Sequence, residues 1–145
     1  MEAKKVINVG SILWGVIAVA VIAVVVYFVI KKTKKSKEQK EYEAQTEAKV
    51  NYSNLSMTKT EFTDLANKLY RAVKGLGTTT DHVYEVFNAL QTDSDLEYLK
   101  LTFGTKDDMN LVEWMYDDLS KKELQRVNKI LSDKGIGYSF YNEIQ

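Results

Sequence analysis

The sequence predicts an all-α protein with a single N-terminal transmembrane helix followed by a compact helical domain. An uncharged apolar stretch fills residues 9–30, and apolar side chains recur at helical spacing between cap-forming residues and glycines in residues 58–145. The chain has no proline, which suits a nearly all-helical protein. We therefore expect four parts: a short polar N-terminus (1–8), a membrane helix (9–30), a basic and charged tether (31–57) and a helical domain (58–145).

The membrane helix is predicted from the length and polarity of residues 9–30, VGSILWGVIAVAVIAVVVYFVI. This stretch matches the roughly 20 apolar residues that a helix needs to cross about 30 Å of hydrocarbon. It ends in a lysine cluster typical of a stop-transfer flank, not in the cleavage site of a signal peptide. The lysine-rich flank predicts a single-pass protein with its C-terminal domain on the cytoplasmic side, or within a virion membrane.

Aromatic and basic residues are expected to lie at the membrane interface, where amphipathic side chains are favoured. The candidates are Trp14, Tyr27, Phe28, Lys31, Lys32, Lys34 and Lys35. The lysines either contact anionic lipid or form a solvated flank. Residues 31–57 either continue the helix or form a flexible charged tether.

Five helices are expected after residue 57. Capping boxes at Thr58–Glu61 and Ser120–Glu123 open the first and the last, and Gly135 ends the last. The acidic pair 107–108 is expected to open the fourth helix, since acidic residues suit the positive end of a helix dipole. Residues 136–145 are expected to pack back on the helices as a short extended tail.

Residues 72–78, AVKGLGT, together with the acidic pair Asp117 and Asp118, resemble one annexin repeat. The resemblance implies a calcium site formed by the backbone carbonyls of Val73, Gly75 and Gly77 and a distant carboxylate. Asp117 fits the spacing of the family, whereas Asp118 fits its acid-then-leucine pattern. Calcium takes six to eight oxygen ligands, which glycine-rich turns and carboxylates supply. The alternative is that the two glycines simply end a helix.

The C-terminal residues carry a second, less specific resemblance. Residues 123–131 followed by residues 134–140 are similar to the ends of small annexin-like modules in bacterial and bacteriophage proteins. Some of those modules are structural components of virions or membranes. This resemblance favours a structural protein.

The residue types exclude several classes of function. The chain has 20 basic and 20 acidic residues and no basic stripe with interleaved aromatics, so we expect no nucleic-acid partner. It has no cysteine and one histidine, and no catalytic motif is present, so we expect no enzymatic activity. Trp114 is either a core residue or an exposed anchor for a protein partner.

These patterns predict a membrane-anchored structural or scaffold protein without a cofactor, apart from the calcium that the annexin resemblance implies. In a phage virion it would link the lipid layer to a protein shell. The expected partners are the lipid bilayer and a capsid or membrane protein, with self-association as a further option. The alternatives are a calcium-dependent phospholipid-binding module and a lysis or pore-forming membrane protein.

Overall fold

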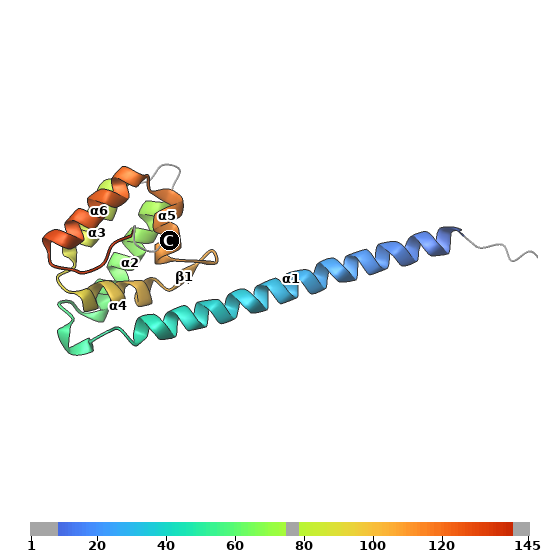
Figure 1. Ribbon diagram of the computed structural model, residues 1–145, viewed down its shortest axis with the longest axis horizontal. Helices are drawn as coiled ribbons and strands as arrows, with labels where there is room; N and C mark the ends of the chain where they lie inside the picture. The colour runs from blue at the N-terminus through green and yellow to red at the C-terminus, as the bar shows by residue number, and fades with distance from the viewer. Residues whose placement is uncertain (1–8, 75–78, 141–145) are drawn as a thin grey trace, which may run out of the picture. The chain divides into compact units, whose positions relative to one another are not determined.

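The computed structural model describes residues 9–74 and 79–140, with side chains from residue 27 onward. The chain divides into two compact units, residues 1–38 and 39–145. Helices dominate the described residues (Figure 1). In chain order the elements are α1 (Val9–Glu47), the 3-10 helix η1 (Tyr52–Asn54), α2 (Lys59–Lys74), α3 (Thr80–Ala89), α4 (Asp93–Phe103), β1 (Thr105–Lys106), β2 (Met109–Asn110), α5 (Leu111–Asp118) and α6 (Lys121–Asp133).

The transmembrane helix predicted over residues 9–30 is not supported, and the predicted fold class is wrong in this element. Helix α1 does not end at the lysines but continues without a break to Glu47. Among the residues that the structure describes, no helix is both long and apolar enough to cross a membrane. The part of α1 after residue 30 holds many lysines and glutamates, and each lysine would cost about 3 kcal/mol at the centre of a bilayer, so residues 31–47 do not lengthen the apolar stretch.

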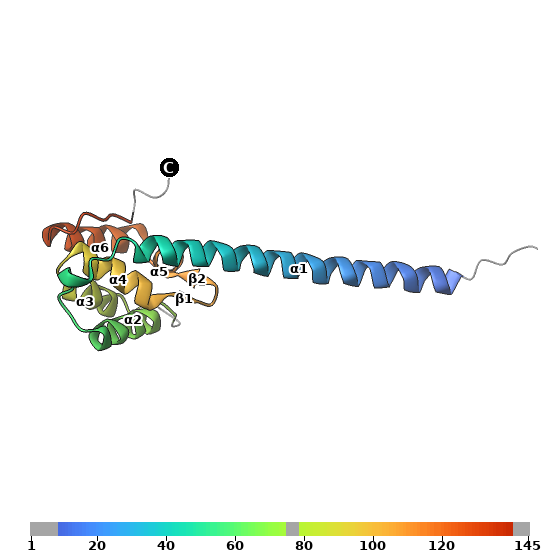
Figure 2. The ribbon, with the colours of Figure 1, turned by 90° about the horizontal axis from the view of Figure 1, so that it is seen from below.

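Helix α2 is the centre of the second unit, because it packs against α3, α4 and α5, while α6 packs against α3. Figure 2 shows α2 and α6 at opposite sides of this unit. Large apolar side chains from every one of these helices are buried, and each contributes about 1.5–3 kcal/mol by leaving water. The largest include Phe62, Leu69, Phe87, Leu99, Phe103, Leu111, Met115 and Leu131.

Two predicted capping boxes are present at helix starts. The Glu61 carboxylate accepts hydrogen bonds from the backbone N–H and the hydroxyl of Thr58, both shorter than 3.0 Å. Ser120 and Glu123 form the same reciprocal pair at the start of α6. Each box satisfies backbone N–H groups that the first turn of a helix leaves without partners.

The acidic pair 107–108 does not open a helix, in contrast to the sequence-based expectation. Asp107 and Asp108 form the two-residue turn of the hairpin β1–β2, with φ angles of 48° and 66°. Consecutive positive φ angles are typical of a type I′ turn, and aspartate tolerates them better than most residues. The helix begins at Leu111, because Asn110 and Glu113 form the capping box three residues further on.

Residues 136–140 cover the helices after α6 ends. Phe140 is fully buried, and its ring meets that of Phe87 edge-on at 5.7 Å. The backbone N–H of Gly137 donates to Asp93, and that of Phe140 donates to Asn128. The C-terminal segment is thus fixed by both apolar packing and hydrogen bonds.

Lys100, on α4, contacts the C-terminal segment of residues 136–140. Its side chain is only 4 % exposed. The ammonium group pairs with Glu97 at 3.0 Å and lies 3.6 Å from the ring centre of Tyr138. A buried cation is retained only where charges or aromatic faces surround it, so this lysine ties α4 to the segment after α6.

A fully buried carboxylate, that of Asp95, joins the chain after α1 to the helical unit. Its Oδ1 accepts from the backbone N–H of Ser56 at 2.8 Å, and its Oδ2 accepts from the Ser56 hydroxyl at 2.6 Å. The same Oδ2 accepts from the backbone N–H groups of Gln91 and Thr92. Burial alone raises the pKa of the Asp95 carboxyl, but these hydrogen bonds outweigh burial and hold the pKa below its usual value.

The residue change Asp95→Asn tests this junction. We expect it to lower the free energy of unfolding by about 2–4 kcal/mol at pH 7, because an amide N–H₂ group would face three donors. Since the native pKa is lowered, the stabilisation by Asp95 is present above the unfolded value near 3.9 and is lost as pH falls through the native pKa. Urea unfolding of both proteins at several pH values measures the difference.

The matched control is Asp64→Asn, at an exposed acidic position on α2. We expect the stability difference for Asp95→Asn to shrink in acid and that for Asp64→Asn to stay small throughout. Equal stabilities of the Asp95→Asn and unchanged proteins at pH 7 would contradict the role given to Asp95.

Candidate interaction surfaces

Four successive large apolar side chains are exposed on α1. Tyr27, Phe28, Val29 and Ile30 are 58–62 % exposed. An α-helix turns by about 100° per residue, so four residues in a row point in nearly all directions around its axis. The predicted interface residues Tyr27 and Phe28 therefore lie in an apolar belt, which we define as residues 27–30. Trp14 lies among the residues whose side chains the structure does not describe.

A lysine cluster follows the belt directly in the same helix. Its members are the predicted interface residues Lys31, Lys32, Lys34 and Lys35, of which the first three are exposed and the last is partly buried. Lys34 lies 3.9 Å from Glu38, and both side chains are more than 60 % exposed. Such an exposed pair contributes little to stability, so breaking the Lys34–Glu38 pair costs little. The aliphatic stems of lysines can also lie along apolar surface while the ammonium groups stay in water.

The structure describes only part of the predicted calcium site. Val73 is buried near the end of α2, and Gly75 and Gly77 lie outside the described residues. Asp117 and Asp118 are the last two residues of α5. Among the described residues, no three histidine, cysteine, aspartate or glutamate side chains are grouped so that they could hold a metal ion. Calcium binding remains a prediction.

The Glu123 carboxylate is hydrogen-bonded to Thr80, the first residue of α3. Its Oε1 accepts from the Thr80 hydroxyl at 3.1 Å, across 43 residues of sequence. The hydroxyl and backbone N–H of Ser120 are the main cause that holds the pKa of Glu123 below its usual value, with Thr80 adding to it. The sequence identifies Glu123 only as a capping residue, because its tertiary contact leaves no local pattern.

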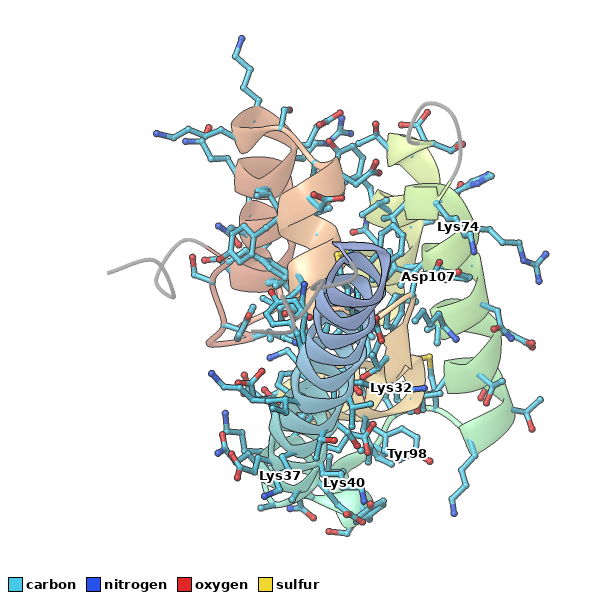
Figure 3. All side chains as sticks on the ribbon, turned by 90° about the vertical axis from the view of Figure 1, so that its right-hand side faces the viewer. Lys32, Lys37, Lys40, Lys74, Tyr98 and Asp107 are labelled. Carbon is cyan, nitrogen blue, oxygen red and sulfur yellow. The ribbon has the colours of Figure 1, made fainter. Side chains whose placement is uncertain are left out.

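A polar cluster fixes the end of α2 against the hairpin. The Tyr70 hydroxyl donates to Asp107 at 2.7 Å, and the Lys74 ammonium lies 2.9 Å from the same carboxylate. Figure 3 shows Lys74 and Asp107 side by side. Lys74, and then Tyr70, hold the pKa of Asp107 below its usual value. The bonds hold the hairpin turn, whose two positive φ angles are uncommon outside glycine, in one place.

The predicted partner anchor, Trp114, lies mostly inside the helical unit. It is 9 % exposed, and its indole N–H donates to the backbone carbonyl of Lys106 at 3.0 Å. The Tyr70 ring meets it edge-on, with ring centres 5.6 Å apart. The indole thus stabilises the contact between α5, α2 and the hairpin, and its role as a partner anchor remains a prediction.

A shallow groove follows the outer side of α5. It is lined by Met109, Glu113, Tyr116 and Asp117. Glu113 and Asp117 are exposed and lie one helical turn apart, whereas Tyr116 is partly buried. The groove therefore combines apolar walls with two carboxylates.

No family model, no curated protein and no solved structure matches this chain. The annexin resemblance and the likeness to bacteriophage modules therefore stay predictions from the residues that carry them.

Tryptophan fluorescence distinguishes a buried Trp114 from an exposed one. The chain has two tryptophans, so Trp14→Phe leaves Trp114 as the only emitter. We expect acrylamide to quench it several-fold less in the folded protein than in the same protein unfolded by guanidinium, because Trp114 is only 9 % exposed and its ring meets that of Tyr70. Quenching equal to that of the unfolded chain would contradict the placement of the indole.

Proposed function

We propose that this chain is a non-enzymatic, membrane-associated structural or scaffold protein. In this proposal residues 27–35 of α1 contact an anionic lipid surface, and the helical unit of residues 39–145 is presented to a protein partner. The observation that carries the proposal is the apolar belt, which is exposed and is followed at once by the lysine cluster.

The belt favours lipid over a protein groove as its main contact. A groove in a partner covers one side of a helix, whereas the four belt side chains point in nearly all directions. A fluid lipid layer adapts to all of them. Covering each such side chain is worth up to about 1.5–3 kcal/mol, so leaving the belt in water would be costly.

The lysine cluster supports a lipid surface that carries negative charge. Basic residues next to a membrane contribute about 1 kcal/mol each through attraction to anionic lipids. Four lysines within five residues therefore add attraction on the order of 4 kcal/mol on such a surface, and much less on a neutral one. Their stems can lie along the same apolar layer that the belt enters.

The carboxylates of the helical unit favour a binding role for this unit over a catalytic one. The carboxylates of Asp95, Asp107 and Glu123 accept hydrogen bonds that hold loops and helix starts in place. The hydrogen bonds that they accept hold the pKa values of these carboxyls below their usual range. The partner that the sequence resemblance favours is a protein shell such as a phage capsid.

A site-specific probe tests the lipid contact. The chain lacks cysteine, so Phe28→Cys accepts a single environment-sensitive fluorophore. We expect its emission to shift to the blue with anionic vesicles, because the probe leaves water. Replacing Lys31, Lys32, Lys34 and Lys35 by glutamine should lower the affinity for anionic vesicles by on the order of 100- to 1000-fold.

The control is the same fluorophore at Thr63→Cys, an exposed position on α2. We expect no spectral shift at this position on adding vesicles. A probe at position 28 that stays in water in the presence of anionic vesicles would overturn the proposal, as would a shift of equal size at position 63.

A further inference from the structure

The groove on α5 fits a helix that presents two lysines one turn apart. Its two carboxylates, Glu113 and Asp117, are separated by four residues and therefore lie on one face of the helix. Met109 and Tyr116 line the space beside them. An aliphatic chain with a positive end would meet apolar atoms along its length and a carboxylate at its tip.

The chain itself contains a segment with this chemistry. Lys37 and Lys40 are both exposed and lie one turn apart on α1, beyond the four lysines assigned to the lipid surface. Figure 3 labels both side chains, in a view along α1. The spacing of these two cations matches the spacing of the two carboxylates on α5, since neighbours three or four residues apart on a helix are about 5–6 Å apart.

We propose that the groove lined by Met109, Glu113, Tyr116 and Asp117 docks the turn of α1 that carries Lys37 and Lys40 from a second copy of this chain. The lysine stems lie on Met109 and Tyr116. One ammonium group pairs with Asp117, and the other pairs with Glu113, whose Oε2 already accepts from the Asn110 N–H and whose Oε1 is left for the lysine. Copies of the chain then associate head to tail, because the basic turn and the groove are different surfaces. This inference does not depend on the lipid contact.

Cross-linking two cysteine variants with a short bis-maleimide tests the contact, since the unchanged chain has no cysteine. The linker spans the gap that a lysine–aspartate ion pair leaves between the two backbones, which a disulfide cannot bridge. One copy carries Lys37→Cys and a second, of different size through an added tag, carries Asp117→Cys. They are mixed in non-ionic detergent without lipid at low salt and then treated with the bis-maleimide. We expect the mixed cross-linked dimer to exceed either homodimer several-fold, and to fall several-fold in 1 M salt, where charges are screened beyond about 3 Å.

Three comparisons decide the outcome. Asp64→Cys, on an exposed acidic position of α2, replaces Asp117→Cys as the matched control and should give little mixed dimer. A chain carrying both Lys37→Cys and Asp117→Cys should form dimers and larger species. An internal cross-link within that monomer, an equal yield with Asp64→Cys, or no mixed dimer at all would each overturn the proposal.

A charge exchange adds a readout that a change in folding would not produce. A lysine-to-carboxylate cross-linker should join fewer copies of a chain that carries Asp117→Lys alone, or Lys37→Glu alone, than of the unchanged chain. A mixture of the two variants should restore cross-linking, because each new charge then meets its opposite. Failure of the mixture to restore cross-linking would count against the pairing.

Discussion

The Asp95 carboxylate is the interaction on which the arrangement of the second unit most depends. This buried charge accepts hydrogen bonds from the backbone N–H and the hydroxyl of Ser56 and from N–H groups that precede α4. A buried carboxylate without these bonds would cost several kcal/mol, so the segment after α1 has little freedom to leave. The nearby bond from the Asn51 N–H to the Ser94 hydroxyl and the burial of Thr46 extend the same junction. Residues 39–57 thus belong to the second compact unit.

Carboxylates hold other helix ends and turns of the described unit in the same way. Glu123 joins the starts of α6 and α3, Glu113 closes the cap of α5, and Asp107 holds the end of α2 against the hairpin. Each carboxylate accepts bonds from groups that helix ends and turns leave without partners. These three carboxylates therefore act as structural acceptors.

Local signals in the sequence predict the local structure well. The capping boxes at Thr58 and Ser120 form as the residue types require, and apolar spacing places the helices because burial of one face stabilises them. The contact of Asp95 could not be predicted from local sequence, since its main partner, Ser56, is 39 residues away. The hairpin could not be predicted either, because two aspartates suit both a helix start and a left-handed turn. Only the Asn110–Glu113 cap decides where the helix begins.

The sequence also does not determine where α1 ends. An apolar stretch followed by lysines is typical of a membrane helix with a stop-transfer flank, yet the helix continues to Glu47, because residues 31–47 are rich in helix formers. For the candidate sites, the lysine cluster and the apolar belt were predictable from composition. The groove on α5 was not, since it depends on Met109 from the hairpin lying beside the exposed face of a helix.

The central claim, that residues 27–35 contact lipid, is tested most directly by hydrogen exchange of the full chain with and without anionic vesicles. Water reaches the exposed belt in solution, so we predict that vesicles slow amide exchange in residues 27–35 at least tenfold. Exchange at residues 91–95, which Asp95 already protects, should not change. Identical exchange of residues 27–35 in both conditions would contradict the account.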